Sequence, residues 1–365
     1  MMPGKGISLL WVALAIGGLL GCSSNNSSSG SSSSSPHLAY VSLPGGNAVA
    51  GFRVSSSGKF TTLVGSPYPG GTSPSSVVVH PSNNFVYAAN QTSNDISLFS
   101  VDGTIGSLTE ILPRTAAGIT PVSMAMDSAG AFLFVANQSS SNISVFSIDS
   151  GSGALTEISG SPFPTSPNPV ALAITPSGKF LYVANANLGY VFAFSIASGV
   201  LTPVAGSPFA VGTAPFALAI DPGEKFVYVA NSSANTLSVL AINATTGALT
   251  TVAGSPFVTG THPISVAVHP SGSFLYVANL ESNNISAYTL DSTTGIPTEI
   301  SGSPASTSTA PVFVVCDPNG QYLYAGAQTD STISVLSIDS TSGVPTGTTQ
   351  SASTTLAPGA MFVTK

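Results

Sequence analysis

Residues Pro169 to Asn185 read Pro-Val-Ala-Leu-Ala-Ile-Thr-Pro-Ser-Gly-Lys-Phe-Leu-Tyr-Val-Ala-Asn, and close variants of this stretch recur along the chain. The apolar runs on either side of Pro-Ser-Gly are typical of two short strands joined by a tight turn. An aromatic residue marks the second run of each repeat, at Tyr40, Tyr87, Phe134, Tyr182, Tyr228, Tyr276 and Tyr324. A period of 46 to 48 residues built from short strands indicates the blades of a β-propeller.

Residues 215–257 show how one repeat fills a four-stranded blade. A turn at Asp221 and a hairpin at Asn243 separate the apolar runs, because both side chains can bond to nearby backbone. Proline is the first residue of the unit and of its first strand, a position where the lack of a backbone N–H donor is tolerated. The expected strands are Phe216 to Ile220, Lys225 to Ala230, Thr236 to Ile242 and Leu249 to Ala253, followed by a return segment, Gly254 to Phe257.

The two ends of the repeat region complement each other. The first repeat begins directly at a second strand, Leu38 to Val41, whereas the chain ends in a lone inner-strand pattern, Gly359 to Thr364. Pairing of these two segments completes one blade and removes the exposed edges of an open ring. The sequence therefore predicts an all-β fold over residues 37–365, a seven-bladed β-propeller with four antiparallel strands per blade, closed by Gly359 to Thr364.

The N-terminal 22 residues have the pattern of an export signal. Lys5 precedes an apolar run from Ile7 to Leu20, which is shorter than the roughly 20 residues of a membrane span. Leu19-Leu20-Gly21-Cys22 resembles a bacterial lipobox, which implies lipidation of Cys22; an ordinary secretory signal is the alternative. Residues 23–36 form a Ser-rich tether. We therefore expect export and lipid anchoring to the cell envelope, and Ser23 favours the outer membrane.

The composition excludes several classes of partner. Without Lys5 the chain has six basic and 14 acidic residues, a net charge of 6 − 14 = −8, so a nucleic-acid ligand is not expected. With Cys22 lipidated, Cys316 has no disulfide partner and is expected to be a buried apolar residue. No metal-ligand or cofactor motif is present, and the expected oligomeric state is a monomer.

The repeats resemble a known family. Tyr-Val-Ala-Asn, a third strand such as Asn-Ile-Ser-Val-Phe and a Gly-x-Leu-Thr turn look like the seven-bladed lactonase-type propellers, which include 6-phosphogluconolactonase-like proteins, muconate-type lactone enzymes and YVTN repeat proteins. The resemblance covers residues 37–365 and implies the propeller fold and lactone hydrolysis. Enzymes of the group share Pro-His-x-His and Asp-x-Gly-x-Asp-Arg stretches, and neither occurs in this chain.

Candidate site residues lie where the repeats approach the central channel. His262, in the return segment Gly260-Thr-His-Pro263, is expected at the channel mouth with Glu281 and Arg114. A lactonase needs a base or activated water, a group that stabilises the oxyanion and a polar anchor for the substrate, and these three residues are of suitable types. Incidental surface positions are the alternative. His80 and His269 occupy a turn position at the other end of the inner strands. Further candidates for ligand binding are Asn90, Asn137, Asn185, Asn231, Asn279 and Tyr190.

Two functional hypotheses follow from these observations. In the first, the chain is a non-catalytic envelope propeller whose loop face binds a protein or carbohydrate, which the missing enzyme motifs favour. In the second, the chain hydrolyses a lactone, as the resemblance implies. The repeated asparagines allow two interpretations as well, because a ring of amides suits a sugar and Asn side chains also cap turns.

Overall fold

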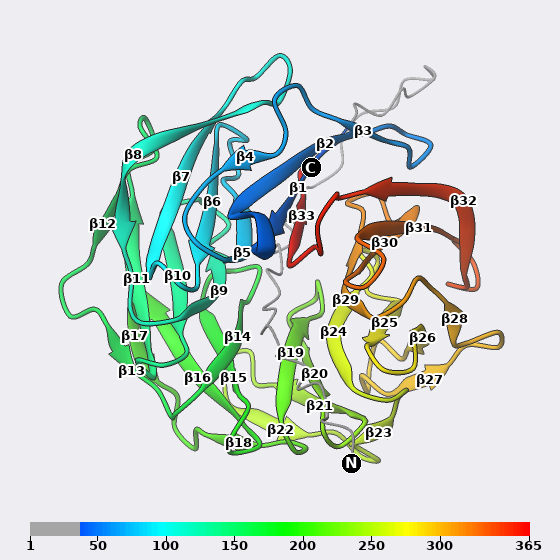
Figure 1. Cartoon of the computed structure of the whole chain (residues 1–365). Helices are drawn as coiled ribbons and strands as arrows, with labels where there is room; N and C mark the ends of the chain where they lie inside the picture. The colour runs from blue at the N-terminus through cyan, green and yellow to red at the C-terminus, as the bar shows by residue number, and fades with distance from the viewer. Residues whose placement is uncertain (1–36) are drawn as a thin grey trace, which may run out of the picture.

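The computed structural model describes residues 37–365, which form seven antiparallel sheets arranged as blades around a central axis (Figure 1). Blade 1 contains the first strand of the described residues, and blades 2 to 7 follow in sequence order. The predicted seven-bladed β-propeller is confirmed. The sheets and the closing strand all lie within the described residues, so residues 37–365 contain a complete propeller.

Each blade contains an inner strand beside the central axis. From blade 2 onward these strands start at the proline of the repeat, and the last one belongs to blade 1: β5 (Pro74–Val79), β9 (Pro121–Met126), β14 (Pro169–Ile174), β19 (Pro215–Ile220), β24 (Pro263–Val268), β29 (Pro311–Cys316) and β33 (Met361–Val363). The second strands carry the repeated aromatic residue: β1 (His37–Leu43), β6 (Phe85–Asn90), β10 (Phe132–Asn137), β15 (Phe180–Asn185), β20 (Phe226–Asn231), β25 (Phe274–Asn279) and β30 (Tyr322–Ala327).

The third strands continue the antiparallel order, and a short 3-10 turn, η1 (Pro44–Gly46), precedes the first of them. They are β2 (Ala48–Val54), β7 (Asp95–Val101), β11 (Asn142–Ile148), β16 (Tyr190–Ala197), β21 (Thr236–Ile242), β26 (Asn284–Leu290) and β31 (Thr332–Ile338).

The outer strand is continuous in two blades, β8 (Leu108–Ala116) and β32 (Pro345–Ser353). In the other five it is split into two short strands that both pair with the third strand: β3 (Phe60–Thr62) and β4 (Tyr68–Pro69), β12 (Leu155–Glu157) and β13 (Phe163–Pro164), β17 (Val200–Pro203) and β18 (Phe209–Ala210), β22 (Leu249–Thr251) and β23 (Phe257–Val258), and β27 (Pro297–Glu299) and β28 (Ala305–Ser306).

This split corrects the expected outer strand Leu249 to Ala253. The chain leaves the ladder at Gly254, whose φ is 83°, and the Oγ of Ser255 accepts the N–H of Val239 at 2.9 Å. The serine oxygen thus takes the place of a backbone carbonyl as the hydrogen-bond acceptor of the third strand. Phe257 then pairs with Leu237. Residues 254–256 therefore form a kink between the two parts of the outer strand, and Phe257 belongs to the second part, so the expected return segment 254–257 does not lead back to the channel.

Ring closure occurs between the two ends of the propeller, as predicted. β33 pairs antiparallel with β1, with Met361 opposite Val41 and Val363 opposite Ala39. The strand itself is shorter than the expected Gly359 to Thr364, but backbone bonds extend the pairing to both residues. Gly359 N–H donates to Ser42 O at 2.8 Å, and Thr364 N–H donates to Leu38 O at 2.8 Å.

The core lies between the flat faces of neighbouring blades. One cluster, for example, joins Val170 and Tyr182 of blade 4 to Leu218 and Leu240 of blade 5. The buried Tyr182 also donates its hydroxyl to Gly247 O in blade 5 at 3.0 Å. Each blade therefore buries its apolar area against the next, and the same backbone is repeated around the axis with the loops at each end held in equivalent positions.

Candidate functional site

The loops at one end of the central channel share a single hydrogen-bonded frame. In blades 2 to 7, the residue before the inner-strand proline accepts at its carbonyl the N–H of the residue that follows the second strand. These bonds are Gln91 to Ser73, Gln138 to Thr120, Ala186 to Asn168, Ser232 to Ala214, Leu280 to His262 and Gln328 to Ala310, at 2.8 to 3.2 Å. The expected proximity of the return loops to the hairpins between second and third strands is therefore observed.

This frame presents two side-chain positions in each of the six blades, which we call the mouth ring. The inner position precedes the proline and is partly buried, in Ser73, Thr120, Asn168, Ala214, His262 and Ala310. The outer position lies one residue beyond the donor in the hairpin and is exposed, in Thr92, Ser139, Asn187, Ser233, Glu281 and Thr329. The backbone frame is constant from blade to blade, whereas the side chains at these positions vary.

Contacts between blades fix the inner positions. Asn235 of blade 5 accepts, at Oδ1, the backbone N–H of His262 in blade 6 at 2.8 Å, and Asn94 holds Thr120 in the same way at 2.8 Å. The inner residues have a left-handed backbone, with φ of 58° at His262 and 60° at Thr120, which a non-glycine residue rarely adopts. Neighbouring blades therefore hold the inner residues in a conformation that isolated loops would avoid.

Three blades join their inner and outer side chains directly. Thr120 Oγ1 lies 2.8 Å from Ser139 Oγ, and Asn168 Nδ2 donates to Asn187 Oδ1 at 2.8 Å. His262 Nδ1 lies 3.1 Å from Glu281 Oε1. The His–Glu pair thus occupies positions that hold hydroxyl or amide pairs in the neighbouring repeats.

The His262–Glu281 pair has the geometry of an oriented imidazole. Side-chain exposure is 25% for His262 and 60% for Glu281, so water reaches both groups. When Nδ1 carries the proton it donates to the carboxylate, which leaves Nε2 free to accept a proton from water or from a ligand hydroxyl. The pair can therefore act as a base or as a polar contact.

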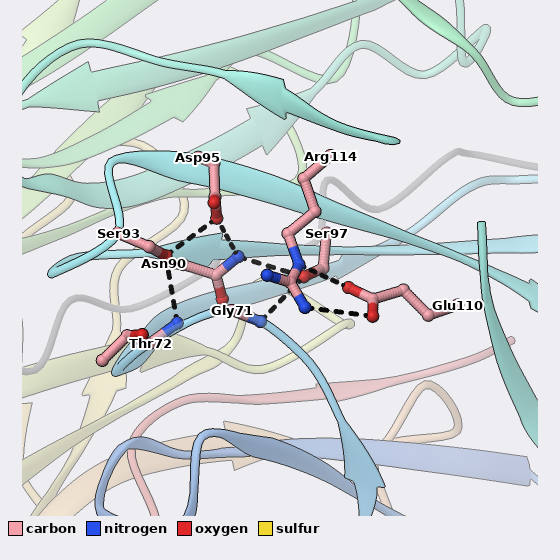
Figure 2. Close-up of polar contacts among 8 residues, drawn as sticks. All are labelled: Gly71, Thr72, Asn90, Ser93, Asp95, Ser97, Glu110 and Arg114. Carbon is pink, nitrogen blue, oxygen red and sulfur yellow. Dashed lines mark hydrogen bonds and ion pairs between the residues drawn. The ribbon is translucent and has the colours of Figure 1, made fainter. Parts of the chain in front are cut away.

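Arg114 does not join this pair. It lies on β8, the outer strand of blade 2, and donates from Nε to Glu110 Oε1 at 2.7 Å (Figure 2). The Glu110 hydrogen bond raises the pKa of the Arg114 guanidinium. In Figure 1, β8 lies at the outside of the ring and β24, next to His262, lies beside the axis in another blade. The structure thus brings together two of the three candidate catalytic residues.

The repeated asparagines lie inside the blades. Asn90, Asn137, Asn185, Asn231 and Asn279 are each at most 1% exposed. Figure 2 shows Asn90, whose Nδ2 donates to Asp95 Oδ1 at 2.7 Å and to Ser97 Oγ at 3.0 Å, both on the third strand. The same pair of hydrogen bonds to the third strand recurs at Asn137, Asn231 and Asn279. These amides hold their own hairpins and do not reach the surface of the mouth.

Two blades vary this arrangement in a consistent way. In blade 4 the third-strand serine is replaced by Phe192, and Asn185 donates instead to Ser166 O. In blade 7 the asparagine is replaced by Ala327, and Ser308 from the return loop bonds to the third-strand Ser334 at 2.8 Å. Both variations keep a hydrogen bond at this level of the blade, but it joins a strand to the return loop instead of crossing the hairpin.

Tyr190 is the one candidate of this group at the surface. It begins β16, is 36% exposed and pairs with Ala210. It follows the mouth-ring residue Asn187 by three positions, so its ring lies on the hairpin that carries the Asn168–Asn187 pair.

His80 and His269 lie at the opposite ends of the inner strands, as expected from their turn positions. His80 Nε2 is 3.1 Å from Gly130 O in blade 3, and His269 Nε2 is 2.9 Å from Gly320 O in blade 7. Both therefore join a turn to the next blade. Cys316 is partly buried on β29, and burial raises the pKa of its thiol. The predicted lipidation site, Cys22, lies outside the described residues.

Sequence reasoning missed most of the mouth ring. Thr120, Ser139, Asn168 and Asn187 carry no motif, and only alignment of the repeats on their prolines would have placed them with His262 and Glu281. Within residues 37–365 no three His, Cys, Asp or Glu side chains are grouped closely enough to hold a metal ion. The described part of the chain also contains no helix with the length and hydropathy of a membrane span.

Comparison with known proteins identifies relatives of this architecture. The family profile "Lactonase, 7-bladed beta-propeller" matches three overlapping stretches, residues 33–172, 158–268 and 253–363. No curated protein sequence matches the chain.

Solved structures share the fold at low sequence identity. A 6-phosphogluconolactonase candidate from Bacteroides fragilis has a TM-score of 0.80 and 22% identity, covering 92% of this chain and 100% of its own. The periplasmic gluconolactonase of Pseudomonas aeruginosa has a TM-score of 0.76 and 17% identity, covering 90% and 99%. Hydrazine synthase of Kuenenia stuttgartiensis has a TM-score of 0.65 and 16% identity, covering 92% and 99%. At such identities the likeness shows the fold alone.

Proposed function

The chain belongs to the lactonase family of seven-bladed β-propellers, and within this family we propose that it is a lipid-anchored envelope protein that binds a polyhydroxylated ligand, such as a carbohydrate, at its mouth ring. The observation that supports binding is the mouth ring itself. A constant frame that displays different side chains in each blade is the arrangement expected of a surface that recognises a ligand.

The chemistry of the ring matches ligand hydroxyl groups. The Asn168–Asn187 pair has amide donors and acceptors, the Thr120–Ser139 pair has hydroxyls, and the His262–Glu281 pair has one ring nitrogen and a carboxylate. The amide and hydroxyl pairs are neutral and bond to ligand hydroxyls without the desolvation penalty of buried charges, and the Glu281 carboxylate, 60% exposed, stays in contact with water.

Stacking on the ligand would come from a tyrosine. The sequence has a single tryptophan, Trp11, which precedes the described propeller, so sugar stacking falls to residues such as Tyr190. Tyr190 stands on the same hairpin as Asn187, which places an aromatic face and an amide within one loop.

Binding can be tested on immobilised polysaccharides and glycans with the propeller, residues 37–365. We expect retention of the wild-type protein, and weakening by about threefold to tenfold when Asn168 and Asn187 are both changed to Ala, the loss of one or two hydrogen bonds. Val258→Ala is the matched control, because Val258 is 78% exposed on β23 of blade 5. Equal retention of both variants would reject the mouth ring as the binding surface.

A second function, lactone hydrolysis, is supported by the family and by one contact, the 3.1 Å approach of His262 to Glu281. In this scheme Glu281 orients the imidazole and Nε2 takes a proton from the attacking water. Arg114 contributes nothing, because Glu110 holds its guanidinium on an outer strand.

The assay for this function is hydrolysis of D-glucono-1,5-lactone, monitored as the acid released while the pH is held constant. A binding protein leaves the buffer rate unchanged. An enzyme raises the rate, His262→Ala abolishes the increase, and Glu281→Gln lowers kcat because the imidazole loses its charged partner. Rate enhancement that survives in His262→Ala would exclude this pair as the catalytic group.

The anchoring part of the proposal depends on Cys22. Cells that express the full chain should incorporate labelled palmitate into it and retain it in the membrane pellet, and Cys22→Ala should lose the label. Unchanged labelling of Cys22→Ala would contradict lipid attachment at this residue.

A further inference from the structure

The channel end opposite the mouth ring contains two adjoining chambers. The larger has a volume of about 130 Å³ and is bounded by the ends of the inner strands in blades 4 to 7 and by the closing strand β33. The second has a volume of about 120 Å³ and is bounded by inner strands of blades 2 to 4. Ile174, Pro176, Phe362 and Lys365 line both chambers, so the two meet at the closing strand.

The side chains in the larger chamber are mainly aliphatic. Ala219, Ala267, Val315 and Met361 contribute to its wall, and Cys316 adds a thiol that is uncharged at neutral pH because burial raises its pKa. An engineered apolar cavity of about 150 Å³ is known to stay dry and to bind benzene, so a chamber of this size fits one six-membered ring.

The wall also carries polar groups, because Asp317 and Lys365 border the chamber and the inner strands contribute backbone groups. β19, β24 and β29 are each the inner edge strand of their sheet, so no further strand pairs with the edge that faces the channel; on β29 the N–H of Val314 donates to Ser265 Oγ at 2.9 Å. Consecutive residues Val266, Ala267 and Val268 line the chamber, as expected where the edge of a strand forms the wall. Backbone N–H and C=O groups at such an edge bond to a ligand oxygen or to water.

We propose that these chambers form a second binding site, separate from the mouth ring, for a compact uncharged ring compound with a single hydroxyl or carbonyl oxygen. The aliphatic walls contact the ring, and backbone groups at the inner edges of β19 and β24 bond to the oxygen. An inner strand of six residues separates the two sites by roughly 20 Å at about 3.3 Å per residue, so each can be occupied independently.

The site can be tested by ¹⁹F NMR of the propeller with three probes. 4-Fluorophenol should show a concentration-dependent shift or broadening at millimolar concentration. Fluorobenzene should bind about threefold to tenfold more weakly, because it lacks the oxygen. 4-Fluorobenzoate should bind more weakly than 4-fluorophenol, because its carboxylate would lose its hydration against a mainly aliphatic wall that also carries Asp317. Absence of any 4-fluorophenol effect, or equal binding of the benzoate, would overturn the proposal.

Variants locate the site. Ala267→Phe and Val315→Phe, on neighbouring inner strands, place a ring in the larger chamber and should reduce 4-fluorophenol binding at least tenfold. Val258→Phe, on the exposed outer strand, should leave binding unchanged. Unchanged binding in both chamber variants would overturn the proposal. A crystal soaked in 4-bromophenol tests the site without any variant. Bromine should appear between β24, β29 and Phe362, and bromine found only elsewhere would contradict the site.

Discussion

Tyr276 of blade 6 donates its phenolic O–H to the carbonyl oxygen of Gly343 in blade 7, at 2.8 Å. Equivalent bonds join Tyr40 to Gly106, Tyr87 to Gly153, Tyr182 to Gly247 and Tyr228 to Gly295. Gly343 has a φ of 72°, and a Cβ there would lie 2.3 Å from the Phe274 ring. The repeated tyrosine and glycine of the sequence are therefore two halves of one contact between blades.

Removal of this hydroxyl should destabilise the propeller. Tyr276→Phe leaves a buried carbonyl without its donor, which costs about 1 to 3 kcal/mol. Blade 3 has Phe134 at the same position, so Phe134→Tyr is the reciprocal variant and should stabilise by about 1 kcal/mol if Gly199 O accepts the new hydroxyl. Urea unfolding measures both, and equal midpoints for Tyr276→Phe and the wild type would contradict the role of this bond.

The closing strand should be essential for a stable ring. Met361 and Val363 are buried in a cluster that also contains residues of blades 1 and 7. Deletion of residues 361–365 removes this contact and exposes the edge of β1, so we expect aggregation or loss of the cooperative thermal transition. The full-length propeller with Lys365→Ala is the control. A truncated protein that melts like the control would show that closure contributes little.

Contacts between blades at the mouth ring should also carry stability. Asn235→Ala removes the acceptor of the His262 N–H and relaxes the left-handed inner residue, at a cost of about 1 kcal/mol. Ser233→Ala, two residues earlier and exposed, should change the melting temperature by much less. If the two variants melt alike, the asparagine does not hold the return loop.

Stability should fall in acid because of carboxylates in hairpins. Backbone N–H groups of Thr294 and Thr293 and the Thr294 hydroxyl lower the pKa of Asp291, and similar bonds lower the pKa of Asp102, Asp149 and Asp339. A lowered folded-state pKa contributes stability above the unfolded value of about 3.8, and this is lost as pH falls through the folded value.

Blade 5 provides the matching neutral residue, since Asn243 Oδ1 accepts the N–H groups of Thr245 and Thr246. Changing Asp149, Asp291 and Asp339 to Asn should flatten the pH dependence below pH 4, measured as the urea midpoint. Burial raises the pKa of Asp127 and Asp221. Protonation of these two groups therefore stabilises the folded protein as pH falls, opposite to the effect of the hairpin carboxylates. A triple variant with the wild-type pH profile would contradict the assignment.

The sequence was sufficient for the ring and its closure because both depend on a period. Tyr40 and Pro311 belong to the repeated pattern, and the apolar runs around such residues are buried when the repeats form blades that pack face to face. The outer strands were less predictable, since Ser255 supplies a ladder acceptor from its side chain and so lets the strand continue past a kink.

The site was predictable only in part. His262 and Glu281 meet because they occupy equivalent loop positions within one repeat, which the periodicity contains. Arg114 belongs to an outer strand that is continuous in its blade, and Leu112 stands there in place of the serine that accepts the third-strand N–H in the split blades. The Asn279 side chain can be buried because Gly260 packs against it without a Cβ, which would lie 2.6 Å from the amide carbon. This packing is visible only in three dimensions.

The central claim is that the mouth ring binds the ligand, and hydrogen–deuterium exchange of the propeller with and without a glycan that it retains tests this most directly. We predict slower exchange in the return loops and hairpins of the mouth ring, at 117–121, 138–141, 165–169 and 186–190, with the outer strands unchanged. Protection confined to the outer strands or to the turns around His80 and His269 would contradict the account.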